Sequence, residues 1–331
     1  MQNDMMKAII SEEPGGAEVL KPGLYKRPVP SGNEVLVRVE ATALNRADIL
    51  QREGKYPPPK GASPVLGLEI AGTVCETGTD AGKWKQGDRV FGLIPGGGYA
   101  EYAVIHEDMA MPVPENLSAI EAAAIPEVFL TAFQSLVWYG KLTAGEKVLI
   151  HAGGSGVGTA AIQIAREIGA EIFITASPQK HKACIGLGAA KAIDYKAEEF
   201  DKVIFEFNGG RGVDLIIDFI AGPYFKKNID LLRTDGRLIL LATLGGGSVD
   251  ELDLRKILSK RLTVTGSTLR SRNLDYQIKL TTDFKESILP KISSGKIKPV
   301  IDSVFALEDV SKAHRYMEEN KNTGKIVLRI K

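Results

Sequence analysis

One segment in the middle of the chain constrains the fold most strongly. It begins with a short apolar stretch at residues 147–152 and passes through the glycine-rich turn GGSGVG at residues 153–158. Apolar residues then recur with helical spacing up to residue 168, and a second short apolar stretch follows at residues 172–175. A strand, a glycine-rich turn, a helix and a further strand in this order are typical of a βαβ unit.

The glycine-rich turn has the chemistry of a phosphate-binding loop. Residues without a Cβ atom let the backbone approach a pyrophosphate, and the N–H groups at the start of a helix favour negative charge. Gly153 and Gly158 occupy the first and last positions of a G-x-G-x-x-G pattern, whereas Ser155 occupies its middle position. We therefore expect a dinucleotide site here. The alternative is a tight connection between a strand and a helix that binds no ligand.

More stretches of the same kind follow along the chain. Residues 213–218, 237–241 and 262–266 are short, apolar and show little alternation. Such strands, separated by helical segments, indicate a parallel sheet that is buried on both faces. The sheet predicts an α/β unit over about residues 125–265.

The first third of the chain has a different pattern. Residues 34–41 alternate between apolar and polar, and residues 67–76 and 88–93 also have the character of strands. Residues 51–64 contain four prolines and two glycines, which predicts a loop. After residue 265 the pattern becomes mixed again, with a strand, a helix and a strand expected at residues 298–305, 307–320 and 324–330.

Composition excludes several classes of protein. The chain has 331 residues with 42 Lys and Arg against 41 Asp and Glu, so no global field favours a nucleic acid or an acidic membrane. Two cysteines, Cys75 and Cys184, exclude a disulfide scaffold, and we expect both to be buried apolar residues. His181 lies three residues before Cys184, but the other three histidines lie far in sequence from both cysteines, and this sparse set of His and Cys residues argues against a zinc site. We expect a cytoplasmic protein without a membrane span or secretory signal.

The residues after the second strand of the βαβ unit indicate which dinucleotide binds. Proteins that bind NAD usually place Asp or Glu here to bind the ribose 2′-hydroxyl. In this chain Ser177 and Lys180 stand at the end of the strand, and Glu171 stands at its beginning. A hydroxyl and a cation suit a 2′-phosphate, which favours NADP(H). The alternative for Lys180 is a solvated lysine on a helix surface.

These features together carry a family resemblance. The chain resembles the zinc-free NADPH:quinone oxidoreductases, the zeta-crystallin-like group of the medium-chain dehydrogenase/reductase superfamily, over essentially its whole length. Asn45 and Leu68 stand where zinc-dependent relatives have a Cys and a His. The motifs that carry the resemblance are ALNRAD at residues 43–48, LGLE at 66–69, GDRV at 87–90, HAGGSGVG at 151–158, and Ser177-x-x-Lys180.

The resemblance implies an architecture and a set of site residues. It implies a GroES-like β-barrel catalytic domain over residues 1–124, an inserted Rossmann domain over 125–265, and a return of 266–331 to the catalytic domain. Cofactor and substrate would meet between the domains. Tyr56 and Asn45 are the catalytic candidates. Tyr56 would orient the substrate oxygen or relay a proton, and Asn45 would supply an amide to the same oxygen or to the cofactor; structural packing is the alternative for both. No residue is assigned to a metal. The residues implied in NADPH binding are Thr131, Gly154, Ser155, Gly156, Val157, Ser177, Lys180, Tyr195, Leu244, Thr268 and Asn322.

The implied activity is reduction of a quinone by NADPH without zinc. An enone or enoyl (2-alkenal) reductase on the same scaffold is the alternative, and a non-enzymatic role in nucleotide sensing, RNA binding or structure is a third. The resemblance also implies a homodimer or homotetramer that pairs through the edge strand at residues 262–266. We expect a small-molecule acceptor and no nucleic-acid partner.

Overall fold

The computed structural model describes residues 4–330. Its chain divides into two compact units, Met1–Leu130 together with Arg270–Lys331, and Thr131–Leu269. These divisions lie a few residues after the expected domain boundaries at 124 and 265. None of the helices described is long and apolar enough to cross a membrane.

The unit Thr131–Leu269 is built on a six-stranded parallel sheet with the order β10-β9-β8-β11-β12-β13. The predicted parallel sheet is therefore confirmed. Its strands are β8 (Lys147–Ile150), β9 (Glu171–Ala176), β10 (Lys191–Asp194), β11 (Val213–Asp218), β12 (Leu232–Leu240) and β13 (Thr263–Gly266).

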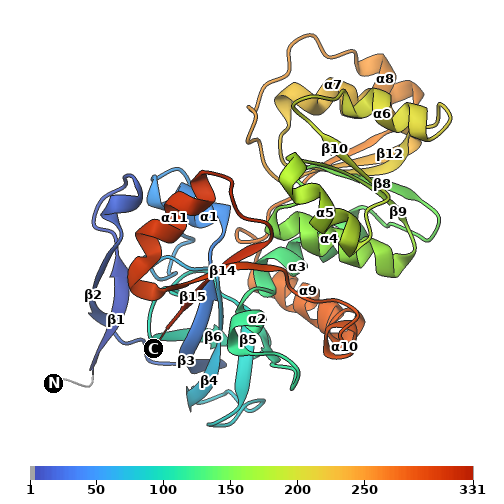
Figure 1. The fold of residues 1–331 in the computed structure, drawn as a ribbon. Coiled ribbons are helices and arrows are strands. Elements are labelled where there is room, and N and C mark those ends of the chain that lie inside the picture. Colours follow the sequence, from blue (N-terminus) through green and yellow to red (C-terminus); the bar gives the residue numbers. More distant parts are fainter. Residues whose placement is uncertain (1–3, 331) are drawn as a thin grey trace. The chain divides into compact units, whose positions relative to one another are not determined.

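Helices cover both faces of this sheet. Figure 1 shows α4 and α5 on one face and α6, α7 and α8 on the other, the arrangement of a doubly wound sheet. The bounds are α4 (Gly156–Ile168), α5 (Pro178–Leu187), α6 (Phe200–Phe207), α7 (Gly222–Leu231) and α8 (Leu254–Ser259). Leu149, Phe173, Ile216 and Leu238 are fully buried in the middle of four adjacent strands, which explains why these strands are apolar without alternation.

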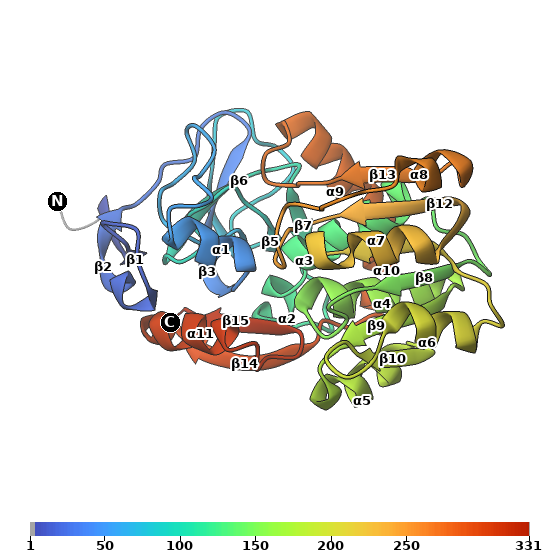
Figure 2. The same ribbon diagram turned by 90° about the horizontal axis from the view of Figure 1, so that it is seen from above.

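The other unit is mainly antiparallel. Its larger sheet has the order β14-β15-β3-β4-β5-β7, with β6 also paired to β3. Separately, β1 pairs with β2 (Figure 2). The strands are β1 (Met5–Ile10), β2 (Lys21–Lys26), β3 (Glu34–Ala43), β4 (Glu69–Thr77), β5 (Arg89–Leu93), β6 (Tyr102–His106), β7 (Ala110–Pro112), β14 (Ile301–Ala306) and β15 (Lys325–Arg329). Because β15 pairs with β3, the end of the chain returns to the sheet that the beginning forms.

Short helices complete this unit. They are η2 (Ala17–Val19), α1 (Arg46–Arg52), α2 (Ala119–Ala123), α9 (Leu274–Ser287), α10 (Leu289–Ser293), η4 (Leu307–Asp309) and α11 (Val310–Glu318). The helix α3 (Pro126–Phe133) continues into the second unit and into the π-helical stretch η3 (Gln134–Tyr139).

Two local expectations need correction. The loop predicted over 51–64 begins after Arg52, because α1 extends into its first two residues. Cys184 is buried, as expected, but Cys75 is only partly buried near the end of β4.

Candidate functional site

The carboxyl end of the parallel sheet gathers five of the predicted cofactor-binding positions. Each follows a different strand, and the strands all run in one direction. Ligands of such sheets bind at this edge, close to the point where the strand order reverses, which here lies between β8 and β11. The five residues are Gly154 after β8, Ser177 after β9, Tyr195 after β10, Leu244 after β12 and Thr268 after β13.

The turn between β8 and α4 is shaped for an anion. The Ser155 hydroxyl accepts a hydrogen bond from the Gly158 N–H at 3.0 Å and so caps the 13-residue helix α4. The N–H groups of Gly156 and Val157 belong to the first turn, where no helical carbonyl precedes them. These amides, together with the positive end of the helix dipole, suit a pyrophosphate.

Lys180 lies against the same turn. A Cβ atom at Gly154 would be 2.6 Å from Lys180 Cδ, so the absence of a side chain at 154 leaves room for the stem of this lysine. Ser177 forms the N-cap position of α5, directly after β9. Glu171 begins β9 and pairs with Lys147 at the opposite edge of the sheet, so no carboxylate of β9 faces this end. The turn and α5 therefore present a hydroxyl and a cation together.

A buried polar network holds this sheet edge in place. His151 Nδ1 lies 3.0 Å from the Thr175 hydroxyl, and His151 Nε2 lies 2.9 Å from the Asn228 carbonyl oxygen. The Asn228 amide nitrogen donates to Asp218 at 2.9 Å, so Nε2 carries the imidazole proton. Burial lowers the pKa of His151, which keeps the ring neutral. The network joins β8, β9, β11 and α7 immediately before the glycine-rich turn.

The other unit contains a buried charged cluster around Glu69. Glu69 Oε1 accepts hydrogen bonds from Asn45 Nδ2 at 2.7 Å and from Lys325 Nζ at 2.8 Å. Lys325 Nζ also donates to Asn45 Oδ1 at 2.7 Å. Glu69 Oε2 accepts the backbone N–H of Glu127, in the first turn of α3, at 2.8 Å. The side-chain amide of Asn45 is therefore engaged at both ends within this cluster.

Tyr56 lies beside Arg270, a cation of the same unit. The Arg270 guanidinium lies 5.5 Å from the centre of the Tyr56 ring, within the range of a cation–π contact. Burial, followed by the neighbouring Glu127 carboxyl, raises the pKa of the Tyr56 hydroxyl above its ordinary value. Tyr56 is only partly buried and follows the end of α1 by four residues, so it remains accessible.

A third polar network surrounds Asp48 in the first turn of α1. The Asp48 carboxylate accepts hydrogen bonds from the backbone N–H groups of Asn45 and Gly67 at 2.8 and 3.3 Å, and from the Tyr99 hydroxyl at 3.1 Å. The Tyr99 oxygen lies 3.2 Å from His314 Nε2. Burial raises the pKa of Asp48 to about 6. These bonds anchor the helix that Asn45 begins.

Two predicted cofactor positions do not follow a strand of the parallel sheet. Thr131 lies in α3, four residues after Glu127, and its carbonyl accepts the Ser135 hydroxyl at 2.7 Å. Asn322 belongs to the antiparallel unit, where its buried amide nitrogen donates to the Gly324 carbonyl at 2.8 Å.

Glu127 and Lys325 were not predicted from the sequence, and Arg270 was assigned no role. One signal was available. Glu127 is the only charged residue in the apolar run AAAIPEVFL at residues 122–130, and a lone carboxylate in such a run is costly unless it is paired or protonated. Lys325 similarly precedes the apolar residues 326–328 in its strand and is buried.

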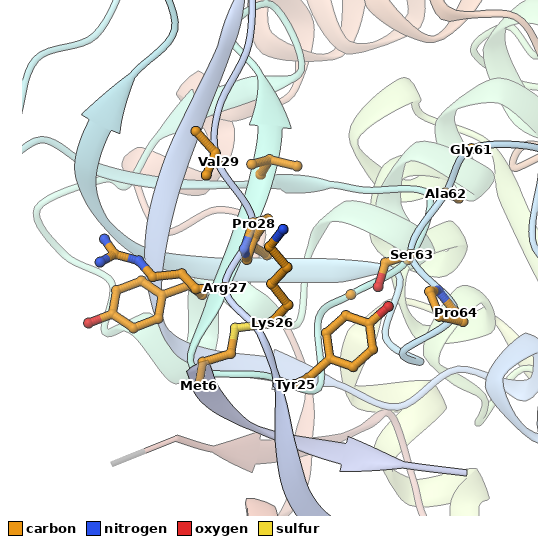
Figure 3. Close-up of a pocket in the computed structure, with 15 residues that line it drawn as sticks. Met6, Tyr25, Lys26, Arg27, Pro28, Val29, Gly61, Ala62, Ser63 and Pro64 are labelled. Atoms are coloured by element: carbon orange, nitrogen blue, oxygen red, sulfur yellow. The ribbon is translucent and has the colours of Figure 1, made fainter. Parts of the chain in front are cut away.

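A surface hollow of about 500 Å³ lies elsewhere in the antiparallel unit (Figure 3). Tyr25, Lys26 and Arg27 line it opposite Ser63 and Pro64. None of the residues predicted from the sequence to act on substrate or cofactor is among its lining residues. One lining residue, Gly96, is close to Arg270, because a Cβ atom at Gly96 would stand 3.6 Å from Arg270 Nη2.

Comparison with known proteins identifies the class. Residues 31–115 match the alcohol dehydrogenase GroES-like domain, and residues 187–328 match the zinc-binding dehydrogenase family. With the sheet edge described above, these matches define an oxidoreductase with a GroES-like domain and a Rossmann-type domain for a nicotinamide dinucleotide. The chain belongs to the medium-chain dehydrogenase/reductase superfamily.

Individual relatives include quinone oxidoreductases and enoyl reductases. The human quinone oxidoreductase is 32% identical over 98% of this chain and 98% of its own length. A phenolphthiocerol/phthiocerol polyketide synthase of Mycobacterium tuberculosis is 35% identical over 96% of this chain, but the chain spans only 14% of that much longer protein. The crystal structure of the CurK enoyl reductase is 29% identical and superposes with a TM-score of 0.87, covering 99% of this chain and all of that one.

The family description names zinc. In residues 4–330, His, Cys, Asp and Glu form no group of three or more that could hold a metal ion.

Proposed function

We propose that the protein is an NADPH-dependent quinone reductase that works without zinc. The observation that carries the proposal is the sheet edge where Lys180 crosses the glycine-rich turn at Gly154 and Ser177 stands beside it. The full-length similarity to the human quinone oxidoreductase supports quinones as the acceptor class. No step is assigned to a metal, because residues 4–330 lack a suitable ligand set.

Each predicted cofactor residue has a proposed task. The amides of Gly156 and Val157, with Gly154 and Ser155, hold the pyrophosphate. Ser177, Lys180 and Tyr195 bind the 2′-phosphate end, which selects NADPH over NADH. Thr131, Leu244, Thr268 and Asn322 serve the nicotinamide half. When bound, the reduced nicotinamide supplies a hydride, and the protein supplies orientation and protons.

Tyr56 and Asn45 are the proposed residues for the acceptor. Tyr56 lies in an accessible loop next to a cation, so its hydroxyl can orient a quinone oxygen. Asn45 donates to Glu69 and accepts from Lys325, so we assign it the task of holding these charges in position. This differs from direct contact with the substrate, because both ends of its amide are already bonded.

An enone or enoyl reductase is the second candidate. The similarity to the CurK enoyl reductase and to a polyketide synthase favours it. The hydride would then reach an activated C=C bond in place of a quinone. The same cofactor site serves both reactions, so the acceptor has to be found by assay.

The test is oxidation of NADPH by the purified protein, followed at 340 nm. We expect 1,4-benzoquinone to give a higher kcat/KM than 2-cyclohexenone or an enoyl thioester, and NADPH to give a higher kcat/KM than NADH. A preference for the enone or the thioester would favour the second candidate. If the protein oxidises NADPH with none of these acceptors, the proposed function is wrong.

We also propose a cytoplasmic homodimer or homotetramer. The free thiols of Cys75 and Cys184 fit a reducing compartment. The sheet ends in an edge strand, β13, through which two copies can pair.

A further inference from the structure

Two buried polar atoms near Tyr56 have no hydrogen-bond partner in the described part of the chain. They are Arg270 Nη1 and Glu127 Oε2, a donor and an acceptor that do not bond to each other. Buried polar groups are almost always hydrogen-bonded in folded proteins, so two orphaned atoms in one place require an explanation. A bound group that bears an oxygen would satisfy both.

The guanidinium of Arg270 is held rigidly. Its Nε and Nη2 atoms both donate to the Pro95 carbonyl, at 2.9 and 2.7 Å, and the residue is only 7% exposed. Two bonds to one oxygen fix the plane of the guanidinium and leave Nη1 as the free donor. A donor fixed in this way is suited to an oxygen that gains negative charge during a reaction.

The surroundings of Glu127 favour the protonated form of its carboxyl group. Among residues 4–330, Lys325 is the only cation hydrogen-bonded to the cluster, and it pairs with Glu69 at 2.8 Å. Among these residues, no cation is hydrogen-bonded to the Glu127 carboxyl group as Lys325 is to Glu69. Glu127 hydrogen-bonds to Glu69 only through its backbone N–H. Like charges in a buried site favour protonation of one of them.

Electrostatics agrees with the geometry. Burial, followed by Glu69, raises the pKa of Glu127 to about 8. The other groups that face it are Asp48, which also raises the pKa, and Lys325 and Arg270, which lower it. Glu127 is therefore a neutral acid at pH 7, whereas burial raises the pKa of the Tyr56 hydroxyl above its ordinary value, which is already far from neutral. An acid with a pKa near the working pH transfers protons more effectively than one with a pKa above 10.

We propose that Arg270 and Glu127 form the site for the acceptor oxygen, where Arg270 Nη1 binds this oxygen and Glu127 protonates it. The inference rests on the proposed reductase function and deepens it. It identifies the acceptor class as a carbonyl compound, a quinone or an enone, whose oxygen becomes negative on reduction. Tyr56 flanks this oxygen site through its contact with Arg270.

The step balances. The acceptor gains a hydride, for which the reduced dinucleotide is oxidised, and the negative charge develops on the acceptor oxygen. Arg270 stabilises this charge by hydrogen bonding. For a quinone, the oxyanion takes a proton from the Glu127 carboxyl group and becomes a hydroquinone. Glu127 is left as a carboxylate and regains its proton from solvent before the next turnover.

The main experiment compares Glu127→Gln with the wild type, using NADPH and 1,4-benzoquinone from pH 6 to 10. We expect wild-type kcat to fall above about pH 8, as Glu127 loses its proton. Glu127→Gln should be slower by about 100-fold and should lack this alkaline fall, because the acid is gone. Glu115→Gln, at an exposed position, is the matched control and should behave as wild type.

A second variant tests the other half of the site. Arg270→Lys keeps the positive charge but loses the pair of guanidinium hydrogen bonds to the Pro95 carbonyl. We therefore expect KM for benzoquinone to rise about 10-fold while KM for NADPH is unchanged. Arg272→Lys is the matched control. An unchanged KM for benzoquinone in Arg270→Lys would overturn the role of Arg270, even if Glu127→Gln does not fold.

A measurement of folding stability, which needs no catalytic turnover, tests the inference separately from the proposed function. A carboxyl group that stays protonated in the fold makes the wild type less stable, relative to Glu127→Gln, as pH rises from 5 to 8. The urea midpoints of the two proteins should therefore diverge over this range. A constant difference, or full activity of Glu127→Gln with the wild-type pH profile, would overturn the inference and leave the proposed function standing. An inactive wild type would overturn both.

Discussion

At the scale of single residues, His314 links the stability of the antiparallel unit to pH. Arg52 Nη1 donates to His314 Nδ1 at 3.3 Å, so the ring proton lies on Nε2 and points to the Tyr99 oxygen. Tyr99 in turn donates to Asp48. Burial and the Arg52 charge lower the pKa of His314 to about 3. The imidazole is therefore neutral in the fold over the whole physiological range.

The consequence is a loss of stability in acid. In the unfolded chain a histidine binds a proton below about pH 6.5, whereas the folded chain resists protonation down to about pH 3. Stability is thus fully present above pH 6.5 and is lost as pH falls below it. Relative to His314→Gln, the wild-type free energy of unfolding should fall by about 2 kcal/mol between pH 7.5 and pH 5. Urea unfolding followed by circular dichroism measures this, and equal pH slopes for the two proteins would contradict it.

At the scale of elements, alanine substitutions at two neighbouring glycines of the β8–α4 turn should have different effects, one mainly on folding stability and the other mainly on the choice of cofactor. A Cβ atom at Gly153 would lie 2.6 Å from Ile174 Cβ, inside β9, whereas one at Gly154 would meet the flexible stem of Lys180. Gly153→Ala should therefore destabilise the fold by about 1–3 kcal/mol through overpacking. Gly154→Ala would place its Cβ atom 2.6 Å from Lys180 Cδ and 2.9 Å from Lys180 Cβ, so it should displace Lys180 and cost less stability than Gly153→Ala.

Displacement of Lys180 should appear in the cofactor preference. We expect Gly154→Ala to lower the ratio of kcat/KM for NADPH over NADH by about 10-fold, which corresponds to one charge-assisted contact of about 1.4 kcal/mol. Thermal unfolding and initial rates with both dinucleotides measure the two effects. If Gly154→Ala keeps the full NADPH preference, Lys180 does not select the 2′-phosphate.

The same element shows how far sequence reasoning reaches. The β8–α4–β9 unit was predictable because its signals are local: a strand of apolar residues, glycines at a turn, and apolar residues with helical spacing after it. The Glu69 cluster was not predictable, because Asn45, Glu69, Glu127 and Lys325 come from four distant segments. Only pairing of β15 with β3 and of β3 with β4 brings three of these segments together.

At the scale of the whole molecule, the change of pattern along the chain predicted the two units. Strands that are apolar throughout indicated the parallel sheet, and the alternating residues 34–41 indicated a half-buried strand in the first third of the chain. The pairing of β1 with β2 and the helices α9 and α10 were not predicted, because their patterns are short and irregular. The proposed acceptor site depends on Arg270 and Glu127, which are far apart in the sequence. The fold brings them together, so no local sequence pattern predicts the site.

The edge of the parallel sheet argues for association of two copies. β13 is the last strand in the sheet order, and Val264 on it is exposed. Leu254 and Leu258 of the preceding helix α8 are also exposed, at 66% and 79%. An unpaired edge flanked by exposed apolar side chains favours strand pairing between two chains.

Light scattering after size exclusion tests this association. We expect the wild type to elute with at least twice the mass of one chain. The double variant Leu258→Glu with Val264→Lys should be monomeric, because it places charges on the exposed helix and on the edge strand. Leu24→Glu is the matched control, since Leu24 is 66% exposed on β2 in the other unit and should leave the assembly intact. A monomeric wild type would contradict the proposal, and a double variant that still associates would show that another surface joins the chains.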